Sequence, residues 1–275
     1  MSTAREWVAL LHADYIHRGK TEATWKDEYL KIFNRLPLDQ ELTGEMLHAL
    51  VLSSPVNTRS RVRHCMAIGV LARFAKLDYD PSPYRGNYNP KHVKPRDLPS
   101  DAKIVQTFLE LRNPAWRWAY GMIATYGLRP HEVFRMDHDL LRTGDVVVHV
   151  DHETKTGFRR VWPYHPEWVE QFQLKSVEIP PIKLDRPNRA IGESAAHYFK
   201  ETARLPFTLY NLRHAWAVRS TLYGLPDAIA AQQMGHSLEV HNKIYQRWIS
   251  RSAHQSAYDA TLQNPNRPKP PSFPD

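Results

Sequence analysis

The chain has 275 residues, of which 42% are hydrophobic, and it carries a formal net charge of +8 with a pI near 9.5. This length and apolar content allow one large or two modest cores and exclude a chain that is disordered throughout. The positive charge favours a polyanionic partner, although many other soluble proteins have a similar balance. Cys65 is the only cysteine, which excludes an intramolecular disulfide and a cysteine-rich zinc site.

The first residues of the chain give no sign of a targeting or membrane segment. Residues 1–18 carry charges between their apolar positions and lack the long apolar stretch of a signal peptide or membrane span. We therefore expect a cytoplasmic protein without a membrane partner, and a single unpaired cysteine agrees with a reducing compartment.

The first part of the chain has apolar side chains at helical spacing over residues 4–77, which predicts a small helical bundle. Thr24 indicates one helix start, and Thr43 precedes a second short helical stretch. A longer helix is expected from about Thr58 to Leu77. These segments predict a helical domain over residues 1–79.

Three arginines, Arg59, Arg61 and Arg63, occupy the first turns of the longer helix. Positive charge at this end opposes the helix dipole, which favours negative charge there. A bound DNA phosphate would remove the conflict, so these arginines are candidate DNA contacts. The alternative is a charged helix start that faces only solvent.

A change of composition over residues 80–99 predicts a basic, proline-rich linker. Its prolines are Pro81, Pro83, Pro90, Pro95 and Pro99. Lys91 and Lys94 lie among them, and both are further candidate DNA contacts because lysine neutralises backbone phosphate.

The remainder of the chain predicts a domain of mixed α and β structure over residues 100–262. Ser100 and Pro114 stand where helices begin, and the β-branched run at 145–150 predicts a strand. Further helices are expected over 193–204, 208–223, 226–234 and 240–262. The proline-rich tail, 263–275, is expected to be unpacked. The fold class predicted for the whole chain is mainly α with a small β-sheet.

Four short motifs follow one another in this second domain. They are Gly127-Leu128-Arg129-Pro130-His131-Glu132, Thr154-Lys155-Thr156-Gly157, Tyr210-Asn211-Leu212-Arg213-His214, and Met234-Gly235-His236-Ser237 followed by Tyr245. In this order they resemble the tyrosine recombinase, or phage integrase, family. The resemblance covers most of the chain, because residues 24–77 also look like the family's helical core-binding domain. It implies that residues 1–79 form a core-binding DNA-binding domain and residues 100–262 a catalytic domain.

The resemblance implies that Arg129 and Arg213 clamp a DNA phosphate. A guanidinium can hold two phosphate oxygens, and Glu132, three residues from Arg129, can orient the first clamp. An ordinary surface ion pair is the alternative for Arg129 and Glu132. Lys155 matches the family's lysine, which donates a proton to the leaving 5′ oxygen, although lysines in turns are usually only solvated.

The third motif departs from the family pattern at its first position. The family has a histidine there, able to share a proton with the nucleophile or the phosphate, whereas this chain has Tyr210. A phenol keeps a hydrogen bond but is not a base near neutral pH. Tyr210 is therefore interpreted either as a supporting site residue or as a core residue beside Leu209 and Leu212.

The last motif is the most specific, because Tyr245 follows His236 by nine residues, as in the family. Gly235 ends one helix in the left-handed region and leaves His236 at the start of the next. Ile244 and Trp248 are expected to form the apolar face of that helix and to leave Tyr245 free. The resemblance then makes Tyr245 the nucleophile and His236 a phosphate contact.

The implied function is a site-specific recombinase that cleaves and rejoins double-stranded DNA through a 3′-phosphotyrosyl intermediate. It needs no metal or nucleotide cofactor, and family members assemble as homotetramers on two DNA sites. Two alternatives remain open at this point. One is a type IB topoisomerase-like enzyme that relaxes DNA, and the other is a non-catalytic DNA-binding protein derived from the recombinases.

Overall fold

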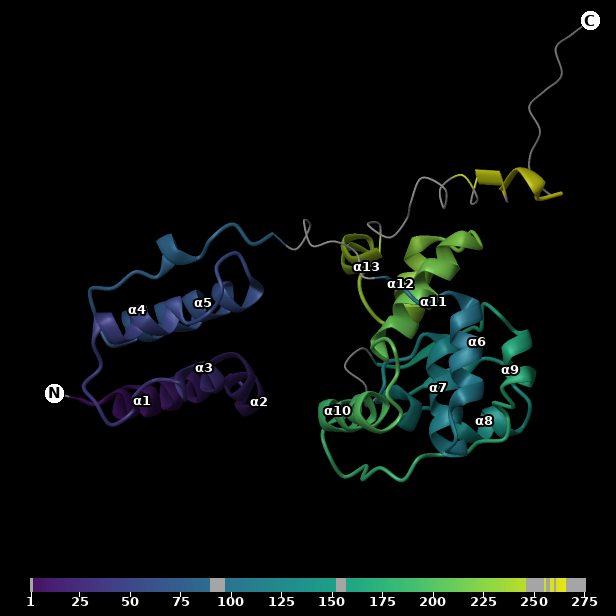
Figure 1. The fold of residues 1–275 in the computed structure, drawn as a ribbon, viewed down its shortest axis with the longest axis horizontal. Coiled ribbons are helices and arrows are strands. Elements are labelled where there is room, and N and C mark those ends of the chain that lie inside the picture. The colour runs from purple at the N-terminus through teal and green to yellow at the C-terminus, as the bar shows by residue number, and fades with distance from the viewer. Residues whose placement is uncertain are drawn as a thin grey trace, which may run out of the picture. The chain divides into compact units, whose positions relative to one another are not determined.

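The computed structural model describes residues 2–89, 97–151, 157–245, 255, 258–259 and 261–265 (Figure 1). The chain divides into two compact units, Met1–Lys94 and Pro95–Asp275. The division falls within residues 80–99, where the sequence predicts a linker. The expected DNA contacts Lys91 and Lys94 lie outside the described residues. The predicted class, mainly α with a small sheet, is confirmed.

The first unit is a bundle of helices. Its elements are α1 (Ala4–His17), α2 (Glu22–Trp25), the π-helix η1 (Lys26–Leu30), α3 (Lys31–Phe33), α4 (Gly44–Leu52), α5 (Arg59–Phe74) and the 3₁₀ turn η2 (Ser82–Tyr84). Helix α5 contacts both α1 and α4. Its buried residues Ile68 and Leu71 meet Trp25, Phe33 and Leu47 in one hydrophobic core.

Threonines cap the helices α1, α2, α4 and α5 of this unit. The hydroxyl of Thr43 accepts a hydrogen bond from the amide of Met46, and Thr58 caps α5 in the same way, as expected for both helix starts. The predicted start at Thr24 is one turn late. Thr21 is the cap of α2, because its backbone is extended and its hydroxyl accepts from the amide of Thr24 at 3.3 Å.

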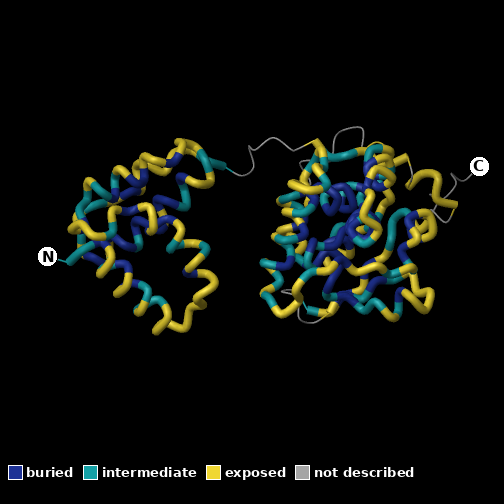
Figure 2. Tube along the Cα trace, turned by 60° about the horizontal axis from the view of Figure 1, so that its bottom comes forward, coloured by how far each residue is buried: buried dark blue, intermediate teal, exposed yellow. Residues whose placement is uncertain are grey.

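The second unit has helices around one small sheet. Its elements are α6 (Asp101–Glu110), α7 (Pro114–Tyr126), the 3₁₀ turn η4 (Glu132–Phe134), α8 (His138–Arg142), β1 (Val148–Val150), β2 (Arg159–Val161), α9 (Glu167–Gln171), α10 (Asn188–His197), the π-helix η5 (Tyr198–Thr202), α11 (Tyr210–Leu222), α12 (Asp227–Met234) and α13 (Leu238–Tyr245). Helix α7 packs against α6, α9 and α11. Its residues from Trp118 to Tyr126 are all buried, and buried segments run through the interior of each unit in Figure 2.

Strands β1 and β2 are antiparallel, with Val148 opposite Val161 and Val150 opposite Arg159. Alternation along β2 turns Val161 and Arg159 to the buried side and Arg160 to solvent. A charged residue therefore occupies a core-facing position of the sheet. The strand predicted over 145–150 forms only in its second half, because Asp145 instead accepts the amide of Val147 in a turn.

Most boundaries in the second unit agree with the sequence. Ser100 caps α6, Pro114 opens α7, and Gly235 ends α12 at φ +63°. Helix α10 begins at Asn188, five residues before the expected position. Helix α13 begins at Leu238, and much of the helix predicted over 240–262 lies outside the described residues. Within the described part of the chain, no helix is long and apolar enough to cross a membrane.

Candidate active site

The site starts from the tight connection that follows α7. Gly127 has a φ of +62°, and a Cβ at this position would lie 2.7 Å from the indole of Trp216, so glycine is required twice over. The chain then turns through Arg129. The backbone amide of Arg129 donates to Oε2 of Glu132 at 2.7 Å, and its Nη1 donates to Oε1 at 2.7 Å. Glu132 therefore fixes both the backbone and the guanidinium of Arg129.

Glu132 is the centre of a buried charge cluster. Its side chain is fully buried and lies 2.6 Å from Nη2 of Arg159 and 3.8 Å from Nη1 of Arg213. Burial raises the pKa of this carboxyl, but Arg159, Arg213 and Arg129 together lower it to about 2. Three guanidinium groups and one carboxylate leave a local charge of +2. The cluster therefore has positive charge to offer a phosphate.

Arg213 holds the cluster to two helix ends. Its side chain is almost fully buried, and Nη1 donates to the carbonyl of Gly127 at 2.6 Å. Its Nη2 donates to the carbonyl of Met234. Arg129 donates from Nη2 to the neighbouring carbonyl of Gly235 at 2.8 Å. The two arginines predicted as phosphate clamps thus meet at the C-terminal end of α12, and only Arg129 retains an exposed part, 20% of its side chain.

Tyr245 lies at the last described turn of α13, and its hydroxyl is 3.2 Å from Nδ1 of His214. The expectation that this side chain would be left free is wrong, because Tyr245 is only 3% exposed. Burial raises the pKa of its phenol to about 12, although the charges of Arg213 and Arg129 oppose the rise. The phenol is therefore protonated at neutral pH in this state.

Tyr210 is the first residue of α11 and is 42% exposed, while Leu209 and Leu212 beside it are buried. The interpretation of Tyr210 as a core residue is therefore wrong. Its ring lies 5.2 Å from that of His214. Burial lowers the pKa of the Arg129 guanidinium. Glu132 and, to a smaller extent, Tyr210 outweigh this effect through charge interaction and hydrogen bonding, so the pKa of Arg129 is raised.

Two further histidines surround the Tyr245 ring. His236 stacks on it at 6.0 Å, and His241 lies at 4.8 Å between ring centroids. Burial, followed by Arg213 and His241, lowers the pKa of His236 to about 4, so the ring is neutral. Within the described chain, neither ring has a hydrogen-bond partner on its nitrogens. Buried polar atoms without partners are unusual, which makes the two rings candidates for a role in the site.

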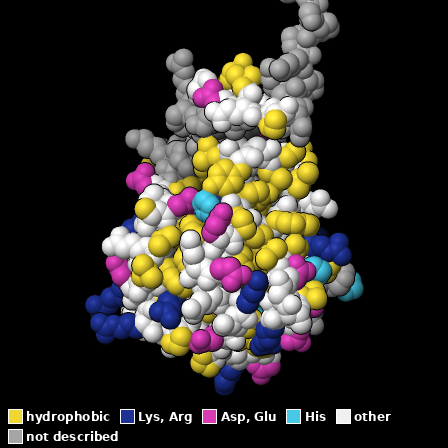
Figure 3. All heavy atoms as spheres, turned by 90° about the vertical axis from the view of Figure 1, so that its right-hand side faces the viewer, with side chains coloured by type: hydrophobic (Ala, Val, Ile, Leu, Met, Phe, Trp, Pro, Cys, Tyr) yellow, Lys and Arg dark blue, Asp and Glu magenta, His cyan; other side chains and the backbone are white. Residues whose placement is uncertain are grey.

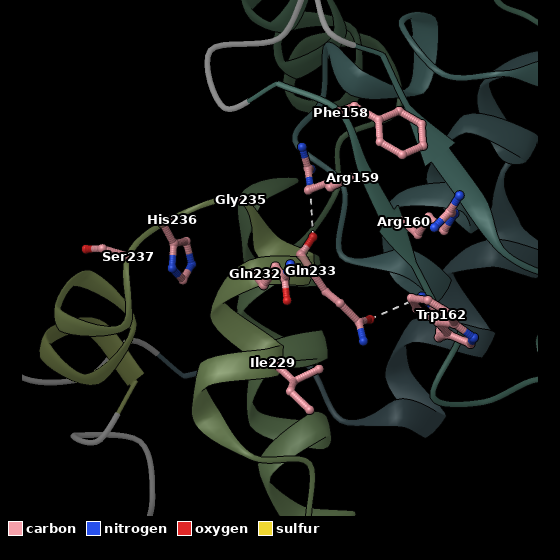
Figure 4. Close-up of a pocket in the computed structure, with 10 residues that line it drawn as sticks. All are labelled: Phe158, Arg159, Arg160, Trp162, Ile229, Gln232, Gln233, Gly235, His236 and Ser237. Atoms are coloured by element: carbon pink, nitrogen blue, oxygen red, sulfur yellow. Dashed lines mark hydrogen bonds between the residues drawn. The ribbon is translucent and has the colours of Figure 1, made fainter.

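A cavity of about 810 Å³ opens beside His236 (Figure 4). It is lined by Phe158, Arg159, Arg160, Trp162, Ile229, Gln232, Gln233, Gly235, His236 and Ser237. Arg159 extends from β2 towards the end of α12, where its Nε donates to the carbonyl of Gln233 at 2.7 Å. No group of three or more His, Cys, Asp or Glu side chains in the described residues is arranged to hold a metal ion.

The sequence motifs predict most of these residues but give no role to two of them. Lys155 lies outside the described residues. Arg129, Arg213, His236 and Tyr245 come together, with Tyr210 at the edge. Arg159 was not assigned a role, although its spacing of two from Val161 on a strand signals the same buried face. His214 matches the last position of the third motif, but the motif by itself assigns it no role.

The three arginines of α5 have different environments. Arg61 is 6% exposed, and its guanidinium donates to the carbonyls of Ser54 at 3.0 Å and Tyr84 at 3.1 Å. It holds the protein's own loops and is not available to a phosphate. Arg63 pairs with Glu28 at 3.1 Å and stays partly exposed, while Arg59 is exposed.

The second unit also has a face on which charge is mixed. Figure 3 shows Lys and Arg side chains interspersed with Asp and Glu there, together with a grouped set of hydrophobic side chains. The net positive charge of the chain is therefore not gathered on this face.

The fold is shared with solved structures over nearly the whole chain. The Tn1549 transposon integrase, in complex with a circular intermediate DNA, has a TM-score of 0.58 at 12% identity, covering 94% of this chain and 99% of that one. A lambda integrase tetramer bound to a Holliday junction has a TM-score of 0.56 at 15% identity, covering 92% and 77%. The chain has the tyrosine recombinase fold, and the resemblance predicted from its motifs is confirmed.

In sequence, the chain is similar to two excisases of Nostoc sp. (strain PCC 7120). It is 34% identical to excisase A in an alignment of 202 residues that covers 62% of this chain and 43% of that protein. It is 31% identical to excisase C in an alignment of 269 residues that covers 85% of this chain and 52% of that protein. The chain thus spans about half the length of these relatives. Residues 5–85 match the family model of the XisA/XisC excisase second domain.

Proposed function

We propose that this protein is a site-specific DNA recombinase that cleaves and rejoins DNA through Tyr245. The observation that carries the proposal is the convergence of Arg129, Arg213, His236 and Tyr245, which come from three separate segments of the chain. Contacts join them at the end of α12, where Arg129 bonds Gly235 and His236 stacks on Tyr245. Two guanidinium groups beside a tyrosine hydroxyl suit attack on a phosphodiester.

In the proposed cleavage step, the hydroxyl oxygen of Tyr245 attacks phosphorus and forms a 3′-phosphotyrosyl bond. The bond from phosphorus to the 5′ oxygen breaks, and Lys155 gives that oxygen a proton. Arg129 and Arg213 donate hydrogen bonds to the non-bridging oxygens, and His236 donates a further one. Tyr210 supports Arg129 at the exposed edge. These donors stabilise the charge that develops on the five-coordinate phosphorus.

The phosphotyrosyl bond conserves the energy of the broken phosphodiester, so a 5′ hydroxyl from another strand can rejoin the DNA without ATP. Double-stranded DNA is the proposed partner, contacted by Arg59, Arg63, Lys91 and Lys94. Arg61 is left out of this set because the neutral carbonyls of Ser54 and Tyr84 hold its guanidinium in the interior of the first unit, whereas the arginines around Glu132 together carry excess positive charge. A homotetramer on two DNA sites is proposed by analogy with the lambda integrase tetramer on a Holliday junction.

A suicide substrate tests the proposal. A duplex made from the DNA that flanks the gene is nicked close to the cleavage position, so that the short cleaved fragment diffuses away and the covalent adduct accumulates. The wild-type chain should form the adduct, whereas Tyr245→Phe should bind the duplex equally well and form none. Tyr258→Phe is the matched control, because Tyr258 is 59% exposed, and it should react like wild type.

A non-catalytic DNA-binding protein is the second candidate, favoured by the burial of Tyr245 and by the missing histidine at Tyr210. It predicts binding to the same duplex with no adduct in the wild-type chain. A type IB topoisomerase-like enzyme predicts relaxation of supercoiled DNA by the single chain. The match of residues 5–85 to an excisase domain favours the recombinase over this enzyme.

A further inference from the structure

We propose that His214 is the catalytic base that takes the proton from Tyr245 during cleavage and returns it during rejoining. The inference rests on the proposed recombinase function. In the family pattern a histidine at the position of Tyr210 is able to exchange a proton at the site. In this chain we assign that exchange to His214, one helical turn further along α11.

The geometry of α11 supports this assignment. Residues four apart lie on the same face of a helix, so Tyr210 and His214 point to the same side. Their rings are in edge contact at 5.2 Å. Nδ1 of His214 lies 3.2 Å from the hydroxyl oxygen of Tyr245, within reach of a hydrogen bond to the reacting atom. Tyr210 instead interacts with Arg129.

The other groups around Tyr245 are poor proton acceptors. Arg213 and Arg129 face it from α11 and from the turn after α7, but a guanidinium has no lone pair to accept a proton. His236 presents its ring face to the Tyr245 ring, and its pKa, lowered to about 4, makes it a weak base. His241, from α13 itself, also has a lowered pKa because it is buried.

The need for a base follows from the state of Tyr245. A phenol whose pKa is about 12 keeps its proton at neutral pH, so attack requires transfer of that proton. The transfer balances in both directions. The proton of Tyr245 passes to Nδ1 of His214 as the oxygen bonds to phosphorus, and Lys155 protonates the departing 5′ oxygen. Rejoining reverses both transfers and returns each group to its starting state.

His214→Gln is the first variant, because glutamine keeps hydrogen bonding but does not accept a proton at neutral pH. With the suicide duplex we expect cleavage to slow by about 100-fold or more, the usual contribution of a general base. Binding of the duplex and the melting temperature should stay close to wild type. His197→Gln is the control, because His197 is exposed at the end of α10, and it should cleave normally.

A duplex with sulfur in place of the bridging 5′ oxygen distinguishes the role of His214 as the base from that of Lys155 as the acid. A thiolate leaves without protonation, so this duplex should restore cleavage by Lys155→Ala. It should not restore cleavage by His214→Gln, because the defect there is in the nucleophile. Restoration of both variants to the same degree would overturn the assignment of His214 as the base.

Restoring the cleavage rate of a His214 variant distinguishes a catalytic base from a residue that only supports the structure. Added imidazole should partly restore cleavage by His214→Ala, and Tyr210→His should partly restore it in the His214→Gln background. The wild-type rate should fall with decreasing pH as His214 becomes protonated, and this fall should be absent in His214→Gln. The other groups that face the Tyr245–His214 pair, Arg129, Arg213, Tyr210, His236 and His241, are unchanged in that variant.

The failures of the two proposals are distinguishable. If the wild-type chain forms no adduct on the flanking DNA, the recombinase proposal fails. If the wild-type chain forms the adduct and folded His214→Gln cleaves at the same rate, the recombinase proposal stands and His214 is not the base. If His214→Gln proves unstable, His214→Asn and the imidazole rescue of His214→Ala test the assignment in its place. If His214→Ala folds but imidazole does not restore its cleavage, that result counts against the proposal.

Discussion

Both units bury an arginine, and the two environments differ in what surrounds the guanidinium. In the first unit Arg61 meets only neutral acceptors, chiefly the carbonyls of Ser54 and Tyr84. In the second unit Arg213 and Arg159 share the carboxylate of Glu132, and Arg129 adds a partly exposed guanidinium. The first arrangement ties loops to a helix, whereas the second gathers excess positive charge beside a tyrosine.

This comparison shows that burial alone does not identify a functional arginine. The guanidinium of Arg61 has hydrogen-bond acceptors in the carbonyls around it, and through them it holds nearby loops to the helix. The Glu132 cluster has three guanidinium groups for one carboxylate, so a phosphate could complete it. Substitutions in the two environments should therefore separate stability from chemistry.

The largest effect is expected for Glu132→Gln, which leaves three arginines without their buried counter-charge. Removal of one partner from a buried ion pair costs about 3–5 kcal/mol of unfolding free energy. The melting temperature of the second unit should fall well below wild type. Glu178→Gln, an exposed carboxyl in the same unit, should melt like wild type.

The loss in Glu132→Gln should depend on pH. The pKa of Glu132 is about 2 in the folded chain and lies below that of an ordinary carboxyl, so its stabilisation is fully present above pH of about 4.3. It disappears as the pH falls towards 2. Thermal melts at several pH values should therefore show wild type and variant converging in acid, and a constant difference would contradict the role of the charge.

Arg129→Ala should lower the rate of adduct formation by about 100–1,000-fold, by analogy with the loss of one transition-state donor. Fold and stability should be largely retained, because part of this side chain is exposed. Arg61→Ala is the matched comparison, and it should cleave at the wild-type rate once the DNA is saturating. Equal loss of cleavage in both variants would remove the distinction between the two environments.

Arg61→Ala should instead reduce the stability of the first unit. Its removal leaves buried carbonyl groups unpaired, at about 1–3 kcal/mol. Amide hydrogen exchange in α4 and α5 measures this loss directly in the full chain. Arg59→Ala, an exposed neighbour on the same helix, should exchange like wild type.

Tyr210→Phe should slow cleavage by about 10-fold, because a hydrogen bond to a charged group contributes at least 1.5 kcal/mol. The melting temperature should change little, since Tyr210 is 42% exposed. Single-turnover cleavage of the suicide duplex measures the effect. A Phe variant with the wild-type rate would show that Tyr210 does not support Arg129 during the reaction.

The smallest effect is expected for DNA affinity. Replacing Arg59 and Arg63 together with alanine should flatten the plot of log affinity against log salt by about 0.9 for each phosphate that the variant no longer neutralises. Arg5→Ala is the control, because Arg5 is exposed on α1 and pairs with Asp39. An unchanged slope would mean that Arg59 and Arg63, at the start of α5, face only solvent and do not contact DNA.

Much of the fold and of the site was determined by local sequence. Thr58 caps α5, Pro114 opens α7, and Gly235 ends α12, because each acts through backbone geometry within a few residues. Spacing within a helix or turn was sufficient for these boundaries. The order of the four motifs adds a resemblance to the tyrosine recombinases, and that resemblance, rather than local spacing, implied that Arg129, Arg213, His236 and Tyr245 share one site.

Only the tertiary structure decided which side chains meet. Arg129 contacts Gly235 across 106 residues, and Arg213 contacts Gly127 across 86. The burial of Arg61 beneath its loops, the three arginines around Glu132 and the contact between His214 and Tyr245 depend on the packing of separate elements. Sequence periodicity fixes the face on which a side chain lies, but the partner on that face is set by how α7, α11, α12 and α13 pack, which local spacing does not encode.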